Sequence, residues 1–318
     1  MSLLVVESAG LQTTVQDFGR EGYGVLGVSA SGAADAVALR VGNLLLENKA
    51  GTPALEMTLM GGTFLFPDGA VICLVGANFG AQMDGKPLEL WRPHAILPGK
   101  RVSFGPTKDF ARCYLCVAGG IGVAEFLGSA STHLLGGLGG WEGRALRKGD
   151  TLPIGRLEKN IRRRKLRTGI LEELKPKKTL RVTRGPQADW FPEEAQGMLA
   201  RGEFVVSEES NRMGLRLDGP RLVALGKPEM VSEGTPLGAI QVTPSGQAII
   251  LFVEQQTTGG YPKIANVIGA DLHSVGQLRP RDTIQFDEVS LPKARALWIE
   301  QQQLLASEER LFLWGAWI

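Results

Sequence analysis

Cysteine and histidine are scarce in this sequence of 318 residues, which contains three of each. Three cysteines do not make the disulfide framework of a small secreted protein. Cys113 and Cys116 have the spacing of half a zinc site, but they lie in an apolar run with no second cysteine pair and no histidine nearby. His94, His133 and His273 stand far apart in the sequence. We therefore expect buried free thiols and no metal site.

An excess of charge of one sign is missing as well. The formal net charge at pH 7 is +2, which argues against a nucleic-acid-binding surface spread over the fold. Basic residues gather only between Arg156 and Lys178. We interpret this run as a solvated linker, with an anion-binding patch as the alternative. No signal peptide is visible, and no uncharged apolar stretch reaches the roughly 18 residues that a membrane span needs. These absences predict a cytoplasmic protein that binds neither nucleic acid nor membrane.

The common nucleotide and nucleophile motifs are also lacking. The sequence has no Gly-x-x-x-x-Gly-Lys-Ser/Thr loop for phosphates and no Gly-x-Ser-x-Gly elbow. The dispersed histidines do not suggest a Ser–His pair. Chemistry, if present, must therefore come from other polar clusters.

Glycine, by contrast, is abundant, with 42 residues and no Gly-X-Y period that would indicate collagen. Short apolar segments alternate with glycine-containing turns, a pattern typical of β-barrels and sandwiches. Helical spacing is clear from Gly32 to Leu46, with Ser31 as the expected N-cap, over Glu193–Ala200, and over Ala294–Leu305. We predict a mainly β protein with a few short helices.

The two halves of the sequence share a weak internal repeat. Gly149–Leu152 is similar to Arg281–Ile284, and each segment lies near the end of its half. Two copies of one β fold would explain the similarity. We predict an N-terminal domain over 1–156, a basic linker over 157–178, a C-terminal domain over 179–290, and a C-terminal helix and apolar tail over 291–318. The tail is expected to dock on its own domain rather than on a partner.

The most unusual segment is Gln256–Pro262, which contains two adjacent threonines, two adjacent glycines and a tyrosine before proline. This composition suits a turn that frees backbone N–H groups beside hydroxyls that form hydrogen bonds. An ordinary glycine hairpin is the alternative. The polar segment Ser210–Gly214 favours a site. Asp35 and Arg144 are ambiguous, because Asp35 would also complement a helix dipole and Arg144 would also form a surface ion pair.

Six polar, glycine-flanked motifs occur in the order found in one protein family: Thr13–Arg20, Ser31–Asp35, Gly143–Leu146, Gly185–Phe191, Ser210–Gly214 and Gln256–Pro262. With these motifs the sequence resembles the biotin-dependent carboxyltransferase-type family that includes allophanate hydrolase subunit 2. That family also contains the C subunit of bacterial ATP-dependent 5-oxoprolinase and the Kip antagonist protein. It is similar to the carboxyltransferase half of urea carboxylase.

The resemblance implies two tandem cyclophilin-like β-barrel domains and an obligate partner of the Kip inhibitor type, the subunit 1 type of this family. For 5-oxoprolinase it also implies a lactamase-type subunit. ATP with magnesium would activate the carbonyl of a lactam, a small-molecule substrate, before hydrolysis to glutamate. The sequence contains no Met-Lys-Met, so we expect no covalent biotin on this chain.

On this resemblance the catalytic residues would be Tyr261 as a general acid, Arg212 as a cationic donor, and Glu254 as a base or magnesium ligand. Arg144 and the backbone of Gly259 and Gly260 would be further donors. The residues assigned to substrate or ATP binding are Ser31, Asp35, Arg144, Asn211, Gln256, Thr257, Thr258, Gly259 and Gly260.

Three functions remain open at this point. The leading hypothesis is a subunit of a heteromeric ATP-dependent amide or lactam hydrolase, with 5-oxoprolinase as its first example. A regulatory protein that sequesters a Kip inhibitor-like partner of a histidine kinase is the second. The third is a urea-type carboxyltransferase component that receives carboxybiotin from another chain.

Overall fold

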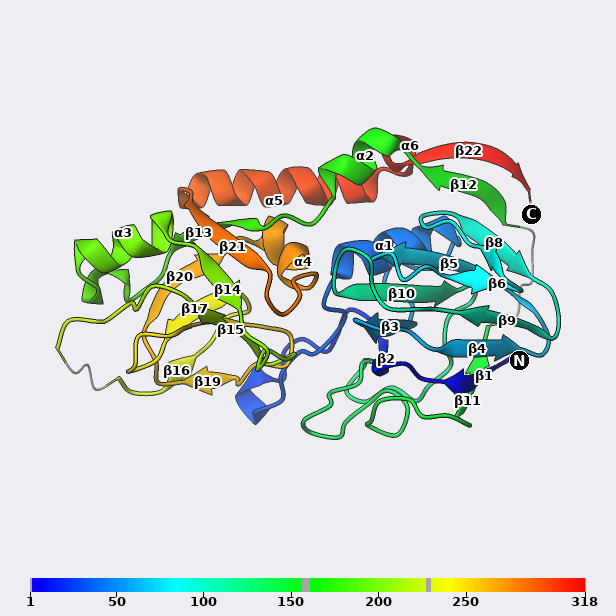
Figure 1. The fold of residues 1–318 in the computed structure, drawn as a ribbon, viewed down its shortest axis with the longest axis horizontal. Helices are drawn as coiled ribbons and strands as arrows, with labels where there is room; N and C mark the ends of the chain where they lie inside the picture. Colours follow the sequence, from blue (N-terminus) through cyan, green and yellow to red (C-terminus); the bar gives the residue numbers. More distant parts are fainter. Residues whose placement is uncertain (1, 156–160, 227–229, 318) are drawn as a thin grey trace. The chain divides into compact units, whose positions relative to one another are not determined.

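The computed structural model describes residues 2–155, 161–226 and 230–317, which form two compact units (Figure 1). Unit 1 contains the chain up to Arg20, Ser31–Lys175 and Leu304–Ile318. Unit 2 contains Glu21–Ala30 and Pro176–Gln303. The chain therefore passes from one unit to the other four times, whereas the sequence analysis predicted consecutive domains.

Unit 1 consists of two β-sheets that enclose a common core. The six-stranded sheet has the order β11-β1-β4-β9-β6-β7, with bounds Thr151–Ile154, Ser2–Ser8, Thr63–Phe66, Lys100–Ser103, Gln82–Met83 and Lys86–Pro87. The five-stranded sheet has the order β2-β3-β10-β5-β8, with bounds Gln12–Gln16, Ala54–Thr58, Arg112–Val117, Ala70–Gly76 and Pro93–Ile96. Apolar side chains of both sheets, such as Phe64 and Leu115, join one buried cluster.

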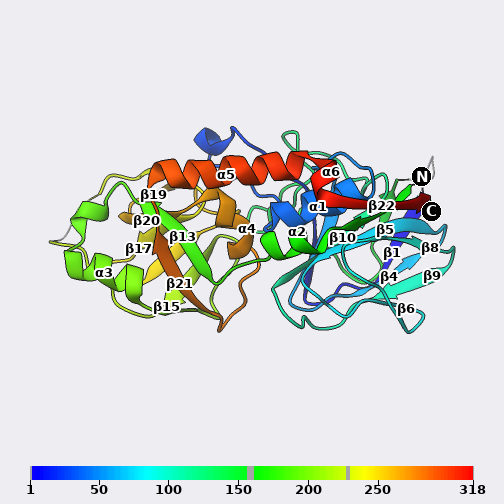
Figure 2. The same cartoon turned by 90° about the horizontal axis from the view of Figure 1, so that it is seen from above.

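Strand β10 is buried on both faces and separates two hydrophobic clusters. Cys113, Leu115 and Val117 belong to the core between the sheets, whereas Tyr114 and Cys116 belong to a second cluster beneath helix α1 (Ala36–Leu45). Figure 2 shows α1 against β5 and β10. This division follows from the alternation of side chains along a strand. All three cysteines are free and buried, as expected from the sequence.

Helix α1 begins at Ala36, four residues later than the sequence analysis expected. Its N-cap is Asp35, whose carboxylate accepts a hydrogen bond of 2.8 Å from the Ala38 N–H. The expected N-cap, Ser31, has a φ of 57° and donates its hydroxyl to the Thr132 carbonyl oxygen at 2.8 Å. Ser31 is therefore part of a preceding turn, and Asp35 satisfies the first orphan N–H groups of the helix.

From residue 161 to Lys175 the basic run is part of unit 1 and is not a solvated linker, whereas residues 176–178 belong to unit 2. Arg162–Leu166 forms strand β12, which pairs with β22 (Phe312–Trp317), and Thr168–Glu173 forms helix α2. The Arg164 side chain is 6% exposed and forms ion pairs with Glu47 and Glu308. A buried, paired guanidinium explains why this part of the run folds despite its charge. The rest of the predicted linker, 157–160, lies outside the described residues.

The C-terminal segment is divided between the two units, since residues 291–303 belong to unit 2 and the part from Leu304 onward to unit 1. It comprises α5 (Leu291–Ala306), α6 (Glu308–Leu311) and β22. Leu304, Leu305, Leu311 and Phe312 are buried in the cluster beneath α1. The predicted helix is therefore confirmed. Its first part packs on unit 2, where Ala294 is buried with Ile268 and Ala270, and only the apolar tail packs on unit 1 instead of the domain that precedes it.

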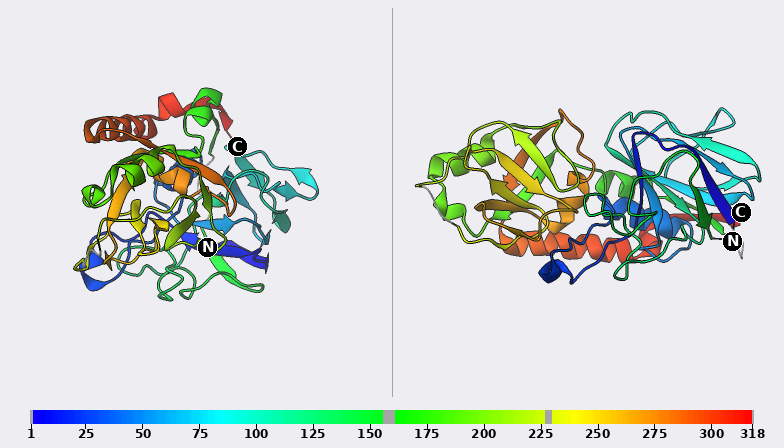
Figure 3. Two further views of the ribbon diagram at one scale, coloured as in Figure 1. Left: turned by 60° about the vertical axis from the view of Figure 1, so that its left-hand side comes forward. Right: turned by 90° about the horizontal axis from the view of Figure 1, so that it is seen from below.

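Unit 2 is a closed seven-stranded barrel, visible in the right panel of Figure 3. Its order is β13-β20-β17-β18-β15-β14-β21, with bounds Thr179–Arg184, Lys263–Val267, Ala239–Val242, Ala248–Leu251, Gly214–Asp218, Phe204–Val206 and Thr283–Glu288. Neighbouring strands are antiparallel except for the parallel pair β13 and β21. The unit also contains the short elements α3 (Glu193–Arg201), α4 (Leu272–Val275), η1 (Gly24–Leu26), η2 (Ala188–Trp190) and η3 (Gly269–Asp271), and most of α5. The predicted mainly β fold is confirmed.

The internal repeat appears in the structure as the same turn in each unit. Asp150 and Asp282 each accept a hydrogen bond from the N–H of the arginine three residues earlier, at 2.7 and 2.9 Å. Their own carbonyl oxygens each accept a 2.9 Å bond from a valine of a neighbouring segment, Val6 and Val206. The two units therefore share a local structure, which supports the interpretation of a tandem repeat. None of the helices in the described ranges combines the length and apolarity that crossing a membrane requires.

Candidate functional site

The two most polar motifs of the second half meet at a cleft of about 270 Å³ in unit 2. The cleft lies over strands β15, β18 and β17 of the barrel. On these strands Leu215, Ile240 and Ile250 point into the core, and the alternate positions line the cleft. The lining residues are Asn211, Met213, Gly214, Arg216, Gln241, Thr243, Ile249, Leu251, Gln256 and Tyr261.

The cleft combines an apolar floor with amide and hydroxyl groups at its sides. Gln241 is 6% exposed and donates from Nε2 to the Tyr261 carbonyl oxygen at 3.4 Å. Asn211 is exposed, and its Oδ1 accepts a 2.8 Å bond from the Met213 N–H, which fixes the turn before β15. Tyr261 is 43% exposed. Such convergent polar groups over apolar walls are typical of small-molecule sites.

Part of the Gln256–Pro262 segment forms a short strand, where the sequence analysis expected a turn. Thr258–Gly259 forms β19, which pairs with β16 (Glu233–Gly234). Neither Gly259 nor Gly260 has a positive φ. A Cβ at Gly259 would lie 2.7 Å from Gln241 Nε2, so any other residue there would displace the Gln241 side chain.

Of the predicted residues in this segment, Gln256 and Tyr261 line the cleft. Thr257, Thr258, Gly259 and Gly260 are not among the lining residues. The Thr257 carbonyl oxygen accepts a 3.1 Å bond from the Thr235 N–H. The backbone around these four residues is therefore engaged with the β16 strand.

Arg212 and Glu254 form a buried ion pair, with side chains 4% and 2% exposed. The Glu254 N–H also donates to the Arg212 carbonyl oxygen at 2.8 Å. Neither side chain lines the cleft, so the structure brings these two predicted catalytic residues to each other and not to Tyr261. Glu254 is a poor match for a magnesium ligand, because its carboxylate is already bound to a guanidinium away from solvent.

Asp35 belongs to a buried polar network in unit 1. The Asp35 N–H donates to the Tyr114 hydroxyl, which donates to Glu56 Oε2, each at 2.7 Å. Arg112 Nε lies 3.5 Å from the other Glu56 oxygen. Burial and the nearby carboxylates of Glu56 and Asp35 raise the pKa of Tyr114 well above its ordinary value. The network anchors the first turn of α1 to β10 and β3.

Arg144 is also engaged within unit 1. Its two terminal nitrogens contact both carboxylate oxygens of Asp150, at 2.7 and 2.9 Å, and it contacts Glu142 as well. The Arg144 guanidinium holds the pKa of Asp150 below its ordinary value. With Ser31 bonded to Thr132, the three site residues predicted in the first half all have partners inside unit 1.

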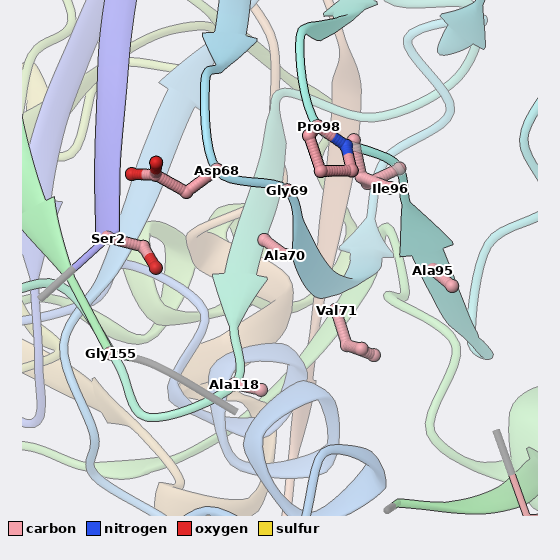
Figure 4. Close-up of a pocket in the computed structure, with 10 residues that line it drawn as sticks. All are labelled: Ser2, Asp68, Gly69, Ala70, Val71, Ala95, Ile96, Pro98, Ala118 and Gly155. Carbon is pink, nitrogen blue, oxygen red and sulfur yellow. The ribbon is translucent and has the colours of Figure 1, made fainter. Parts of the chain in front are cut away.

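A larger cavity of about 440 Å³ lies in unit 1, and its chemistry is different (Figure 4). Most of its lining residues are small and apolar, and Asp68 supplies the one carboxylate among them. Asp68 Oδ2 accepts a 3.2 Å bond from the Leu3 N–H. Without convergent polar side chains, this cavity is a weaker candidate than the cleft of unit 2.

The sequence analysis missed Gln241, Arg216 and Thr243, although they line the cleft. Gln241 gives a usable signal, because it is a polar residue in the apolar strand Ala239–Val242. Arg216 and Thr243 give none, since polar residues at alternate strand positions usually face water. Among the described residues, no three His, Cys, Asp or Glu side chains gather as metal ligands would.

A family model, curated relatives and solved structures all match this chain over most of its length. Residues 26–288 match the family model "Carboxyltransferase domain, subdomain A and B". The chain is 38% identical to the C subunit of 5-oxoprolinase from Escherichia coli over 95% of its length and 96% of the relative's. It is also 38% identical to the 5-oxoprolinase C subunit from Haemophilus influenzae, over 90% of this chain and 91% of the relative. The Kluyveromyces lactis urea carboxylase structure matches with a TM-score of 0.90 and 31% identity, over 97% of this chain and 30% of that one.

Proposed function

This chain belongs to the family of carboxyltransferase domains with subdomains A and B, and on that premise we propose that it is the C subunit of a heteromeric 5-oxoprolinase. The 38% identity to the bacterial C subunit, which extends over nearly the whole of both chains, carries the proposal. The reaction would be the ATP-dependent hydrolysis of 5-oxoproline to glutamate in the cytoplasm.

The cleft of unit 2 is the site at which we place the lactam. A lactam offers one N–H donor and one carbonyl acceptor, which complement the side-chain amides of Asn211, Gln241 and Gln256. Arg216, which also lines the cleft, suits the carboxylate of 5-oxoproline. Tyr261 would donate a proton to the substrate as a general acid. Arg212 and Glu254 would support the site from beneath as a pair.

ATP and magnesium fit the described residues of this chain less well. Magnesium bound to phosphates usually needs one or two free carboxylates, and the predicted ligand Glu254 is buried against Arg212. We therefore propose that ATP and magnesium are bound mainly by the partners, a Kip inhibitor-like subunit and a lactamase-type subunit. This chain would contribute the lactam-binding cleft.

The experiment is reconstitution of the three subunits from one genome, with 5-oxoproline-dependent ATP hydrolysis and glutamate release as readouts. Each subunit is omitted in turn. Activity that disappears without this chain supports the proposal. A stable complex that is inactive on 5-oxoproline would contradict it and would favour a regulatory role toward a Kip inhibitor-like partner.

Tyr261→Phe tests the cleft itself. If Tyr261 is the general acid, kcat falls by roughly 100-fold or more, and stability is unchanged because the side chain is 43% exposed. Tyr23→Phe is the matched control, since Tyr23 does not line the cleft. Equal activity of both variants would remove Tyr261 from the mechanism.

A urea-type carboxyltransferase is the second candidate, and the TM-score of 0.90 to urea carboxylase favours it. In that case the assembled complex would carboxylate urea with a biotin carrier on another chain. Biotin-dependent turnover of urea, blocked by avidin, would support this function. ATP use that is insensitive to avidin would exclude it.

A further inference from the structure

Lys263 is a buried lysine that the proposed mechanism does not use. It is the first residue of β20, two residues after Tyr261, and it is 2% exposed. Lysine is almost never buried without a partner. Its Nζ lies 2.5 Å from Oε1 of Glu233, in strand β16. The ion pair therefore joins the barrel to the two-stranded β16–β19 sheet.

Gln187 connects the same two residues a second time. Its Nε2 donates to Glu233 Oε1 at 2.9 Å, and its Oε1 accepts the Lys263 N–H at 3.1 Å. Gly185 permits this approach, because a Cβ there would lie 2.2 Å from the Lys263 carbonyl oxygen. The Gly185–Phe191 motif, to which the proposed function assigns no role, thus serves to hold this ion pair.

The strand that carries Glu233 in turn holds the residues beside the cleft. Glu233 and Gly234 pair with Gly259 and Thr258. The next residue, Thr235, donates its N–H to the Thr257 carbonyl oxygen at 3.1 Å and its hydroxyl to the carbonyl oxygen of Gln256. Gln256 lines the cleft. A continuous set of bonds therefore leads from Lys263 to a cleft residue.

The segment between Glu254 and Lys263 is fixed by an ion pair at each end. Arg212 holds Glu254 at one end, and Glu233 holds Lys263 at the other. The first pair is fully buried, but the Glu233 side chain is 45% exposed. Because breaking a partly exposed ion pair costs less stability than breaking a fully buried one, the second pair is suited to positioning rather than to global stability.

We propose that Lys263 and Glu233 form a latch, braced by Gln187, that positions Gln256 and Tyr261 in the cleft. The two latch residues are positioning residues, since neither lines the cleft. Loss of the latch detaches β16 from the barrel, releases the 255–259 segment and displaces the Gln256 side chain. The effect of the latch on 5-oxoproline turnover rests on the proposed function, whereas its effect on amide hydrogen exchange does not.

The test compares Glu233→Gln, Lys263→Met and the double variant with Glu208→Gln, which breaks an exposed pair with Arg281 in the same unit. Amide hydrogen exchange of the full chain is measured at Thr235, in the β16–β19 region, and at Ile250, in the barrel. We expect at least tenfold faster exchange at Thr235 in each latch variant, no further increase in the double variant, and no change at Ile250. Glu208→Gln should resemble the wild type.

Exchange that rises equally at Thr235 and Ile250 would show a purely structural pair and overturn the latch, as would unchanged exchange at Thr235. In the reconstituted complex, Glu233→Gln should raise KM for 5-oxoproline at least tenfold, with kcat within threefold. An unchanged KM in an active complex would also overturn the latch. An inactive wild-type complex would instead refute the proposed function, and the exchange result alone would then decide whether the latch exists.

Discussion

The polar motifs of unit 1 and unit 2 have similar compositions but different surroundings. In unit 1 Asp35, Tyr114 and Glu56 bond to one another in a buried network, and Arg144 is bound to Asp150. In unit 2 the side chains of Gln241 and Gln256 border an open cleft. Polar residues beside glycine therefore mark two different things, a buried anchor in one unit and the border of an open cleft in the other.

The difference has a physical cause in where each motif lies. The motif around Asp35 precedes a helix that packs on a buried sheet, so every polar group there must find a partner inside the protein. The Gln256–Pro262 motif lies at the edge of a barrel strand, where one side remains open to solvent. Predictions that disturb one unit and leave the other intact test this contrast.

The largest effect is expected from Arg212→Met. The variant leaves the Glu254 carboxylate, 2% exposed, without its cation, and removal of one partner of a buried pair costs about 3–5 kcal/mol. Urea unfolding of the full chain measures the loss. The double variant Arg212→Met, Glu254→Leu should recover most of it, and a double variant as unstable as the single one would contradict a simple ion pair.

A smaller effect is expected from Tyr114→Phe in unit 1. The phenol bridges the Asp35 N–H and Glu56 Oε2, and buried groups left unsatisfied cost about 1–3 kcal/mol each. Thermal unfolding should report the loss, while activity per folded molecule stays at the wild-type value. Reduced activity with full stability would show that the unit 1 network takes part in function and would break the contrast.

The smallest effect concerns acid stability and Arg144→Gln. Arg144 lowers the pKa of Asp150 in the folded protein. The contribution of this ion pair to the free energy of unfolding is therefore fully present above the pKa of an unfolded aspartate, about 3.9, and disappears as the pH falls through the folded pKa. From pH 5 to 7 the free energy of unfolding of the wild type, measured by urea unfolding, should exceed that of the variant by about 1 kcal/mol or less. This difference in stability should close below pH 4. A difference that grows below pH 4 would contradict a lowered pKa of Asp150.

The sequence was sufficient for the mainly β class, the helices at Glu193–Ala200 and Ala294–Leu305, and the two motifs at the cleft. These features rest on local periodicity and turn residues, which a single sequence contains. It was insufficient for the burial of Arg164, because the strand partner β22 lies about 150 residues away. Pairing over such distances depends on tertiary contacts that propensity does not encode.

The site shows the same limit at the level of single side chains. Arg212 and Glu254 are polar residues in polar motifs, and only the fold shows that they neutralise each other. Lys263 follows Tyr261-Pro262 and has no distinguishing pattern of its own. Its ion pair with Glu233 depends on strand β16, thirty residues earlier in the chain.

The place of the chain from Leu304 onward in unit 1 has a consequence for biosynthesis. Leu304, Leu311 and Phe312 complete the hydrophobic cluster beneath α1, yet they are translated long after Lys175. At about 5–20 residues per second, the first unit emerges from the ribosome roughly 6–30 s before the residues that finish its core. During that interval its exposed apolar face is a natural substrate for chaperones, so nascent chains should depend on them more than the mature protein does.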